Sequence, residues 1–286
     1  MTGLTFYLSG NQSGRVKAII INRHISNHQA ILKPIFRVFS FCILFLFVGL
    51  PAKAQDDTPT YLYQNWLGLM TSTQISERFS LWNDAHYVNK SFFIYRTGIT
   101  YHSKQNRTVT TVGYARLLLT APFSDGSLVR DEHRPWAQII YRLPGGPKFG
   151  TSFRFRYDAR FRQALLESET GTGYDLSHRF RFNAVVRYNW GKVLTKNHDF
   201  TTSLLNESLF MDGAAIDQTL WEHRTFLMFG LSKGGNTYSM GYVMRFMDLN
   251  PSLTRINHGL VLWATIHFDL RKIRRPSLII HPTDHI

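Results

Sequence analysis

The sequence has 286 residues, with 33 Lys and Arg against 19 Asp and Glu, a formal net charge of +14 and one cysteine. Residues 1–54 hold six of the basic residues and none of the acidic ones, so the remaining 232 residues carry 27 basic residues and a net charge of +8. This moderate excess is weak evidence for nucleic-acid binding, and the length is sufficient for one domain.

The N-terminal part has the composition of a secretory signal peptide. A basic segment, residues 33–37, precedes residues 38–50, which are apolar except for one serine, and an Ala-x-Ala cleavage site ends at Ala54. The apolar run is shorter than the roughly 20 residues of a transmembrane helix. We therefore expect a leader and signal peptide over residues 1–54, with cleavage after Ala54. Export would remove Cys42, which excludes disulfides, thiolate zinc sites and cysteine nucleophiles, and it would keep the chain from nucleic acid.

Beyond residue 54 the chain is a series of segments in which apolar and polar side chains alternate. A period of two indicates β-strands, because successive side chains of a strand point to opposite faces. We expect a periplasmic lead-in or first strand at residues 55–77, a barrel at residues 78–270 and a C-terminal tail at residues 271–286. The ten strands predicted in the barrel lie at residues 78–88, 92–102, 108–120, 132–143, 149–162, 177–190, 199–211, 220–231, 238–246 and 256–270.

Residues 149–162 show this alternation most clearly. Phe149, Phe155 and Phe161 lie on an apolar face, whereas the opposite face carries four arginines and one aspartate. On a helix the arginines would be spread around the cylinder, so their spacing favours a strand. Residues 177–190 repeat the pattern, with arginines on one face and phenylalanines on the other.

Three features favour an outer-membrane barrel over a soluble β-sandwich, which also alternates. The strands are longer than the average of about 5–6 residues in soluble proteins. Longer connections follow the strands that end near residues 120, 164, 211 and 247, with shorter ones between, as in outer-membrane barrels. In a soluble sandwich, seven arginines on one face of two neighbouring strands would also repel one another, which counts against that fold.

We therefore predict an all-β fold, a single antiparallel transmembrane β-barrel of about 10 strands in a bacterial outer membrane, surrounded by outer-membrane lipids. Counting residues 61–72 as a strand gives eleven. Because bacterial barrels have even strand numbers, twelve is the alternative.

The inward face of the predicted barrel is the candidate for chemistry. Cross-strand neighbours lie about 5 Å apart, so carboxylates can reach guanidinium groups on the next strand. One interpretation is an ion-pair network that fills a narrow interior. The other is an anion-selective constriction with small anions as ligands, because rings of arginine select anions in pores. The candidate lumenal residues are Glu132, Arg134, Arg142, Arg154, Arg156, Asp158, Arg160, Arg162, Arg179, Arg181, Arg187, Glu207, Glu222, Arg224 and Arg245.

No motif in the sequence indicates catalysis. His-Glu-x-x-His and a phosphate-binding glycine loop are absent from it. Asp131 and His133 could share a face, but no serine is placed to complete a catalytic group. Ser177 and His178 are adjacent and therefore point to opposite faces of a strand. We expect no enzyme, no cofactor and no metal site, and we keep an outer-membrane lipid-modifying enzyme as an alternative.

Three short motifs carry a resemblance to a known family. They are Glu132-His133-Arg134-Pro135-Trp136, the Arg-x-Arg-x-Asp-x-Arg run from Arg154 to Arg160, and Ser177-His178-Arg179-Phe180-Arg181. With them, residues 66–269 resemble an uncharacterised family of Gram-negative outer-membrane barrel proteins, common in Bacteroidetes and classed as a domain of unknown function. The resemblance implies the fold and the location, and it brings no activity and no catalytic residues. We expect a structural role, or a narrow transport or binding role, at the cell envelope.

Overall fold

The computed structural model describes residues 59–120, 128–166, 169–213, 220–250 and 253–271, and these ranges contain strands and no helix. Consequently, no membrane-spanning helix is found among them. The predicted signal peptide, its cleavage site and residues 272–286 lie outside the described ranges. The strands are β1 (Thr60–Tyr63), β2 (Trp66–Gln74), β3 (Phe79–Val88), β4 (Phe92–His102), β5 (Thr108–Thr120), β6 (Val129–Arg142), β7 (Phe149–Leu165), β8 (Thr170–Gly191), β9 (Asp199–Gly213), β10 (Leu220–Lys233), β11 (Asn236–Asn250) and β12 (Leu253–Asp269).

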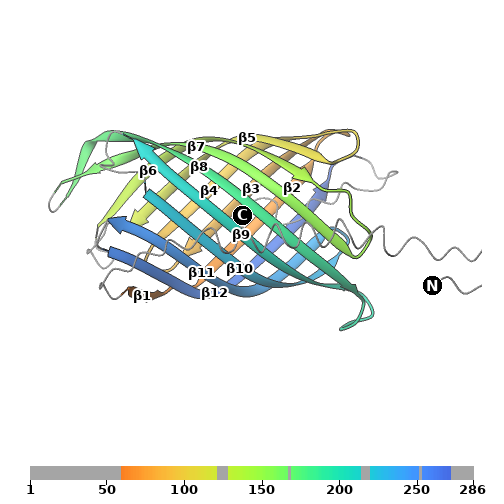
Figure 1. The fold of residues 1–286 in the computed structure, drawn as a ribbon. Helices are drawn as coiled ribbons and strands as arrows, with labels where there is room; N and C mark the ends of the chain where they lie inside the picture. Colours follow the sequence, from red (N-terminus) through yellow and green to blue (C-terminus); the bar gives the residue numbers. More distant parts are fainter. Residues whose placement is uncertain (1–58, 121–127, 167–168, 214–219, 251–252, 272–286) are drawn as a thin grey trace, which may run out of the picture. The chain divides into compact units, whose positions relative to one another are not determined.

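Strands β2 to β12 form a closed barrel (Figure 1). Each strand pairs with the next along the chain and β12 pairs with β2, so eleven strands close the ring and β1 lies outside it. The predicted all-β barrel is therefore confirmed. The predicted count of ten is too low, and the described total of twelve strands is close to the alternative. The additional ring strand is β2, whose outward Thr71 and Thr73 lack the apolar alternation that marks the other strands.

The ring closes through a parallel pair of strands. Trp66 lies opposite Val261 and Gln74 opposite Asp269 in the β2–β12 pairing, whereas the other ten pairings of the ring are antiparallel. In an up-and-down meander with an odd number of strands, the first and last strands run in the same direction. A ring of eleven must therefore close in parallel, which corrects the prediction of a wholly antiparallel barrel. Strand β1 extends the parallel pairing along β12.

The two ends of the barrel have connections of similar length. We call them the Trp66 end, where β2 begins, and the Asp269 end, where β12 finishes. The predicted alternation of long and short connections does not occur. Strand pairing continues past the predicted strand ends through irregularities at Gln163/Leu165 and Asp248/Asn250, and this shortens two loops. The connections are residues 89–91, 121–128, 166–169, 214–219 and 251–252 at the Trp66 end, and residues 75–78, 103–107, 143–148, 192–198 and 234–235 at the Asp269 end.

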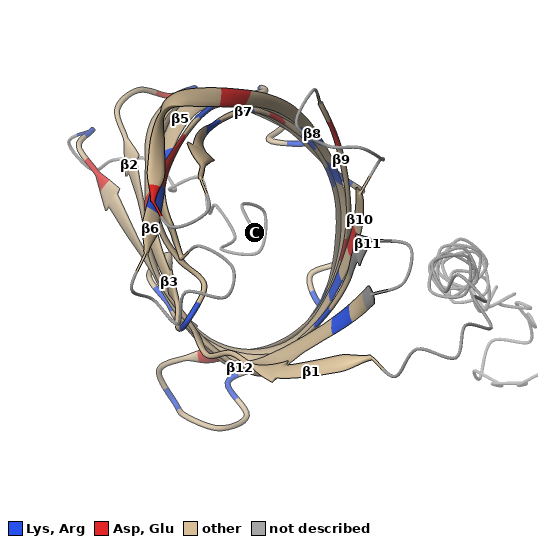
Figure 2. Ribbon diagram, turned by 90° about the vertical axis from the view of Figure 1, so that its left-hand side faces the viewer, with Lys and Arg blue, Asp and Glu red and all other residues tan. Residues whose placement is uncertain are grey.

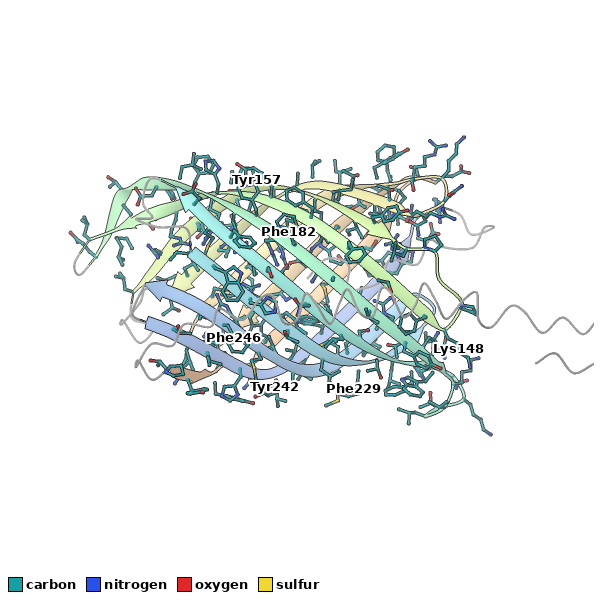
Figure 3. All side chains as sticks on the ribbon, in the orientation of Figure 1. Lys148, Tyr157, Phe182, Phe229, Tyr242 and Phe246 are labelled. Atoms are coloured by element: carbon teal, nitrogen blue, oxygen red, sulfur yellow. The ribbon has the colours of Figure 1, made fainter. Side chains whose placement is uncertain are left out.

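Side chains alternate between the interior and the outer surface along each strand. On β7, Arg154 and Arg156 are buried, whereas Phe153 and Phe155 are each 38% exposed. A single sheet closed on itself encloses only its inner face, so the buried set points inward and the exposed set outward. Figure 3 shows side chains on both faces of the wall, including the outward Tyr157.

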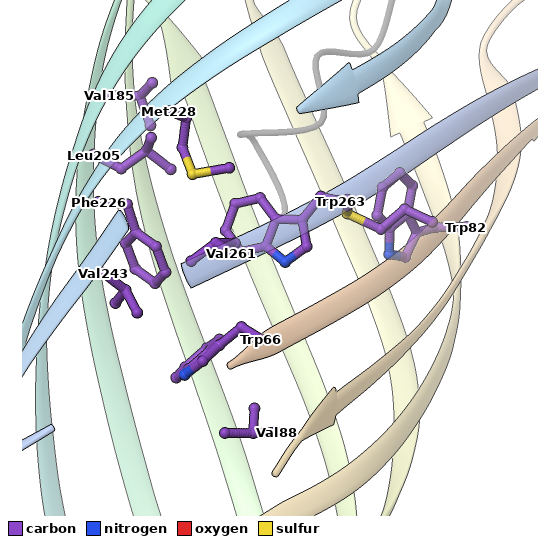
Figure 4. Close-up of a cluster of buried hydrophobic side chains, with 11 residues drawn as sticks. Trp66, Trp82, Val88, Val185, Leu205, Phe226, Met228, Val243, Val261 and Trp263 are labelled. Atoms are coloured by element: carbon purple, nitrogen blue, oxygen red, sulfur yellow. The ribbon is translucent and has the colours of Figure 1, made fainter. Parts of the chain in front are cut away.

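An apolar cluster fills one side of the interior (Figure 4). The ring of Trp66 on β2 lies 5.9 Å from that of Phe92 on β4 and 5.7 Å from that of Phe226 on β10. Phe226 in turn lies 5.4 Å from Trp263 on β12. These strands are not all neighbours in the ring, so the rings pack across the interior. The cluster consists of Trp66, Met70, Trp82, Val88, Val185, Leu205, Phe226, Met228, Val243, Val261 and Trp263.

Candidate functional site

The structure places all fifteen predicted lumenal residues on the inner face of the barrel. Eleven of them are buried, and Arg142, Arg162, Arg187 and Arg245 are half-buried. Their strands, β6 to β11, are consecutive in the ring. Figure 2 looks along the barrel and shows charged positions on these strands around the wall.

The alternation within β7 and β8 brings the central charges together. Arg156 lies opposite Arg181 across the strand pair, and Asp158 lies opposite Arg179. Because every second residue faces inward, consecutive inward positions on both strands form one surface of guanidinium groups. Asp158 is the one buried carboxylate on β7 and β8, and its contacts show how the arginines are stabilised.

Asp158 binds two arginines through both of its oxygens. Its Oδ1 accepts from Nε of Arg156 at 2.9 Å and from a terminal nitrogen of the same guanidinium at 2.7 Å. Its Oδ2 accepts from Arg179 at 3.1 and 3.0 Å. The carboxylate is completely buried. Charge-assisted hydrogen bonds of this kind compensate for the loss of solvent around a buried ion.

Glu132 on β6 binds three arginines. Its carboxylate accepts from Arg160 at 2.7 and 3.0 Å and from Arg162 at 2.7 Å, and it also pairs with Arg134 on its own strand. Arg162 lies opposite Glu132 in the β6–β7 register, so the strand pairing fixes this contact. The alternation along β6 and β7, together with their register, therefore brings Glu132 and its three arginines together.

Two further carboxylates extend the network to β10 and β11. Glu207 on β9 accepts from Arg181 at 3.0 and 2.8 Å and pairs with Arg154 and Arg224. The pair of Arg154 on β7 with Glu207 reaches across β8.

Glu222 on β10 ends the network on this side. Its carboxylate pairs with Arg224 on the same strand and with Arg245 on β11, and Arg245 also donates to Oε2 at 2.9 Å. Arg224 binds both Glu207 and Glu222 and so links the two groups.

A fifth carboxylate, which was not predicted from the sequence, lies on the opposite wall. Asp84 on β3 accepts from Nε of Arg96 on β4 at 2.6 Å and from the indole nitrogen of Trp82 at 2.7 Å, and it lies 3.6 Å from His86. Asp84 and Arg96 occupy directly opposed, buried positions. Asp84 and Arg96 both occupy inward positions of the alternating pattern, so their facing could have been predicted. They were missed because each strand carries a single inward acid or arginine rather than a cluster of charges.

Aromatic rings connect the charged wall with the apolar side of the interior. The guanidinium of Arg156 lies over the ring of Trp136, 4.2 Å from its centroid, and that of Arg224 lies 5.4 Å from the centroid of Trp66. A cation over an indole face is attracted by the ring quadrupole, most strongly where water is absent. The network and the apolar cluster therefore form one packed interior.

The network contains twice as many arginines as carboxylates. Five carboxylates, at Asp84, Glu132, Asp158, Glu207 and Glu222, pair with ten arginines. Four of the carboxylates bind two or three guanidinium groups each, so removal of one acid leaves several buried cations without their counter-charge.

Two of the predicted residues lie apart from these carboxylates, near the Asp269 end. Arg142 donates to the backbone oxygen and to Oδ1 of Asn106 at 2.9 and 3.0 Å. Arg187 donates from Nε to Oγ of Ser203 at 3.3 Å.

Histidines on the outer wall lie within hydrogen-bond distance of hydroxyl groups. His178 lies 2.7 Å from the hydroxyl of Tyr157, and His223 lies 3.0 Å from that of Ser208. His133 contacts the hydroxyl of Tyr114. Within the described ranges, no group of three or more His, Cys, Asp or Glu is arranged to hold a metal ion.

One inward constellation resembles a catalytic triad and was not predicted. Oγ of Ser80 lies 2.9 Å from Nε2 of His102, whose Nδ1 lies 3.3 Å from Oδ1 of Asn106. These distances fit a nucleophile, a base and an orienting group. Ser80 and His102 are both 0% exposed, so a substrate does not reach the hydroxyl in this structure.

Comparison with known proteins confirms the predicted membership of a family of unknown function. No curated protein matches the chain significantly. A family model described as a protein of unknown function, DUF2490, matches residues 63–256, which include the strands of the charged network. The match covers more than half of the chain, which therefore belongs to the DUF2490 family of proteins of unknown function and folds as a β-barrel.

Proposed function

We propose that the chain is an outer-membrane β-barrel with an arginine-lined but closed interior, and that it has a structural or binding role at the envelope of a Gram-negative cell. The observation that carries the proposal is the distribution of side chains across the wall, with charges inside and apolar residues outside. A soluble barrel would bury its phenylalanines and expose its arginines.

The outer wall carries an apolar band that passes from strand to strand. Its residues are large, apolar and about half exposed, an arrangement that favours hydrocarbon rather than water as the surrounding solvent. Members of the band include Leu69 (49%), Ile99 (57%), Val112 (57%), Ile139 (46%), Phe182 (49%), Leu227 (44%) and Leu262 (51%).

Amphipathic aromatic residues border the band. Near the Asp269 end, Tyr101, Tyr141 and Trp190 stand at or close to strand ends with their rings exposed. Towards the Trp66 end, Tyr157 pairs with His178, and Tyr242 pairs with His258 at 2.6 Å. Rings with a polar tip occupy membrane interfaces, where one part meets lipid and the other meets water.

The filled interior favours a structural or binding role over an open pore. Arg156, Asp158, Glu207 and Phe226 are each at most 1% exposed, and the apolar cluster packs across the interior beside them. An anion-selective channel needs arginines that face a water-filled path. Here ten inward arginines bind carboxylates, so we expect no anion conductance.

A heat-modifiability gel on membrane fractions tests the location. The full chain expressed with its N-terminal segment should fractionate with the outer membrane and migrate differently before and after boiling, because folded membrane barrels resist detergent. A chain that is monomeric and stable in buffer without detergent would refute the membrane proposal.

Planar-bilayer recording tests the closed interior separately. The reconstituted protein should give no steady conductance, and a reproducible anion-selective current would show that the interior opens.

A further inference from the structure

A cavity of about 390 Å³ opens inside the barrel near the Asp269 end. We call it the vestibule. It lies between the β6–β7 connection and the ends of β8 to β11 that meet there. Ligand pockets typically measure about 300–1,000 Å³, so the volume corresponds to a small molecule.

The floor of the vestibule is the apolar cluster. Val185, Met228 and Trp263 line the cavity, and each is at most 3% exposed. Figure 4 shows Met228 beside Trp263 in this cluster. The vestibule is therefore closed at its inner end by apolar and aromatic side chains. None of the five carboxylates of the charged network lines it.

The walls of the vestibule are rich in hydroxyl groups. A hydroxyl both donates and accepts a hydrogen bond, so a ring of them suits a ligand that itself carries several hydroxyls. Some of these groups also contact one another, as in the 3.0 Å contact between Ser232 and Thr237. The lining hydroxyl residues are Thr151, Ser152, Thr201, Ser203, Ser232, Thr237 and Ser239.

The charges of the vestibule are predominantly positive. Lys148 and Lys233 are exposed, and Arg142 and Arg187 are half-buried. Asp199 is the single carboxylate among the lining residues, all of which the structure describes. Four cations against one anion favour a negatively charged ligand.

We propose that the vestibule binds a small anionic sugar, that is, a polyol of sugar size that carries a carboxylate or a phosphate group. The lysines and arginines bind the acidic group, the hydroxyl residues bind the sugar hydroxyls, and the ring of Trp263 supports the apolar face of the sugar. The inference goes beyond the proposed function and does not depend on it, because the vestibule belongs to the folded barrel wherever the barrel resides.

Isothermal titration calorimetry on the full chain folded in detergent micelles tests the proposal. The probes are glucuronate, glucose 6-phosphate, neutral glucose and inorganic phosphate. At least one anionic sugar should bind at least tenfold more tightly than both glucose and phosphate, and the one that binds better identifies the acidic group. Absence of binding by both anionic sugars, or equal binding of phosphate, would overturn the proposal.

Variants locate the binding in the vestibule. The double substitution Lys148→Gln/Lys233→Gln should weaken binding at least fivefold, whereas Lys104→Gln should leave it unchanged. Lys104 is exposed on the β4–β5 connection at the same end and does not line the cavity. Ser239→Leu should abolish binding by filling the cavity, provided that the gel shift shows a folded barrel. Unchanged binding in the double lysine variant, or in folded Ser239→Leu, would overturn the proposal.

Discussion

Replacement of Asp158 by Asn should destabilise the barrel strongly. The substitution preserves size but removes the counter-charge of Arg156 and Arg179, which are 1% and 5% exposed. Four hydrogen bonds of 2.7–3.1 Å join these guanidinium groups to the carboxylate, and the amide can accept through only one oxygen. Breaking a buried ion pair by removing one partner costs about 3–5 kcal/mol. That is a large part of the typical stability of roughly 5–15 kcal/mol.

Urea unfolding in detergent micelles, followed by tryptophan fluorescence, measures this loss. Trp136 lies against Arg156, so its emission reports on the same region. Asp131→Asn is the matched control. That carboxylate is on the outer wall and binds Arg116, whose side chain is 61% exposed, so the unfolding midpoint should not change. Equal midpoints for the two variants would show that the buried pairs contribute no net stability, and the account of the network would be wrong.

Three further substitutions test the outer wall, the strand contacts and the interior. If lipid covers this face, Phe182→Arg should lower the free energy of unfolding in bilayers by about 2–4 kcal/mol. A loss no larger than that of Phe182→Leu, measured by urea titration, would contradict this. Gly113→Ala should cost about 1–3 kcal/mol, because the added Cβ would overlap the carbonyl oxygen of Thr97. Gly150→Ala has open space and should be neutral, so equal stability of the two variants would count against the close approach of β4 and β5 at Gly113. The double variant Trp66→Ala/Trp263→Ala removes two large rings from the apolar cluster and should create a conductance in planar bilayers. A folded variant without conductance would show that other groups close the interior.

The facing of the charged strands could be predicted because it depends on local periodicity alone. Every second residue from Arg154 to Arg162 points inward whatever the neighbouring strands do. The same rule applies to β12, where Leu260 and Leu262 are exposed and Val261 between them is buried. Predictions of this kind need no knowledge of which strands pair.

The features that depend on distant pairing could not be predicted in the same way. Strand β2 enters the ring by pairing with β12, which lies at the other end of the barrel sequence. Apolar and polar residues alternate only weakly in β2 itself. The contacts of Trp66 with Phe92 and Phe226 cross the interior, so they require the curvature of the closed ring. The ion pair of Arg154 with Glu207 skips a strand, which a rule for adjacent strands does not anticipate.

If the barrel spans a membrane, as proposed, the parallel seam between β2 and β12 has a consequence for the two membrane faces. Since the meander has an odd number of strands, the chain enters the ring at one mouth and leaves it at the other. An epitope inserted beside Trp66 and one inserted beside Asp269 would then be labelled from different compartments. A barrel with this parity offers each compartment one attachment point on the same polypeptide.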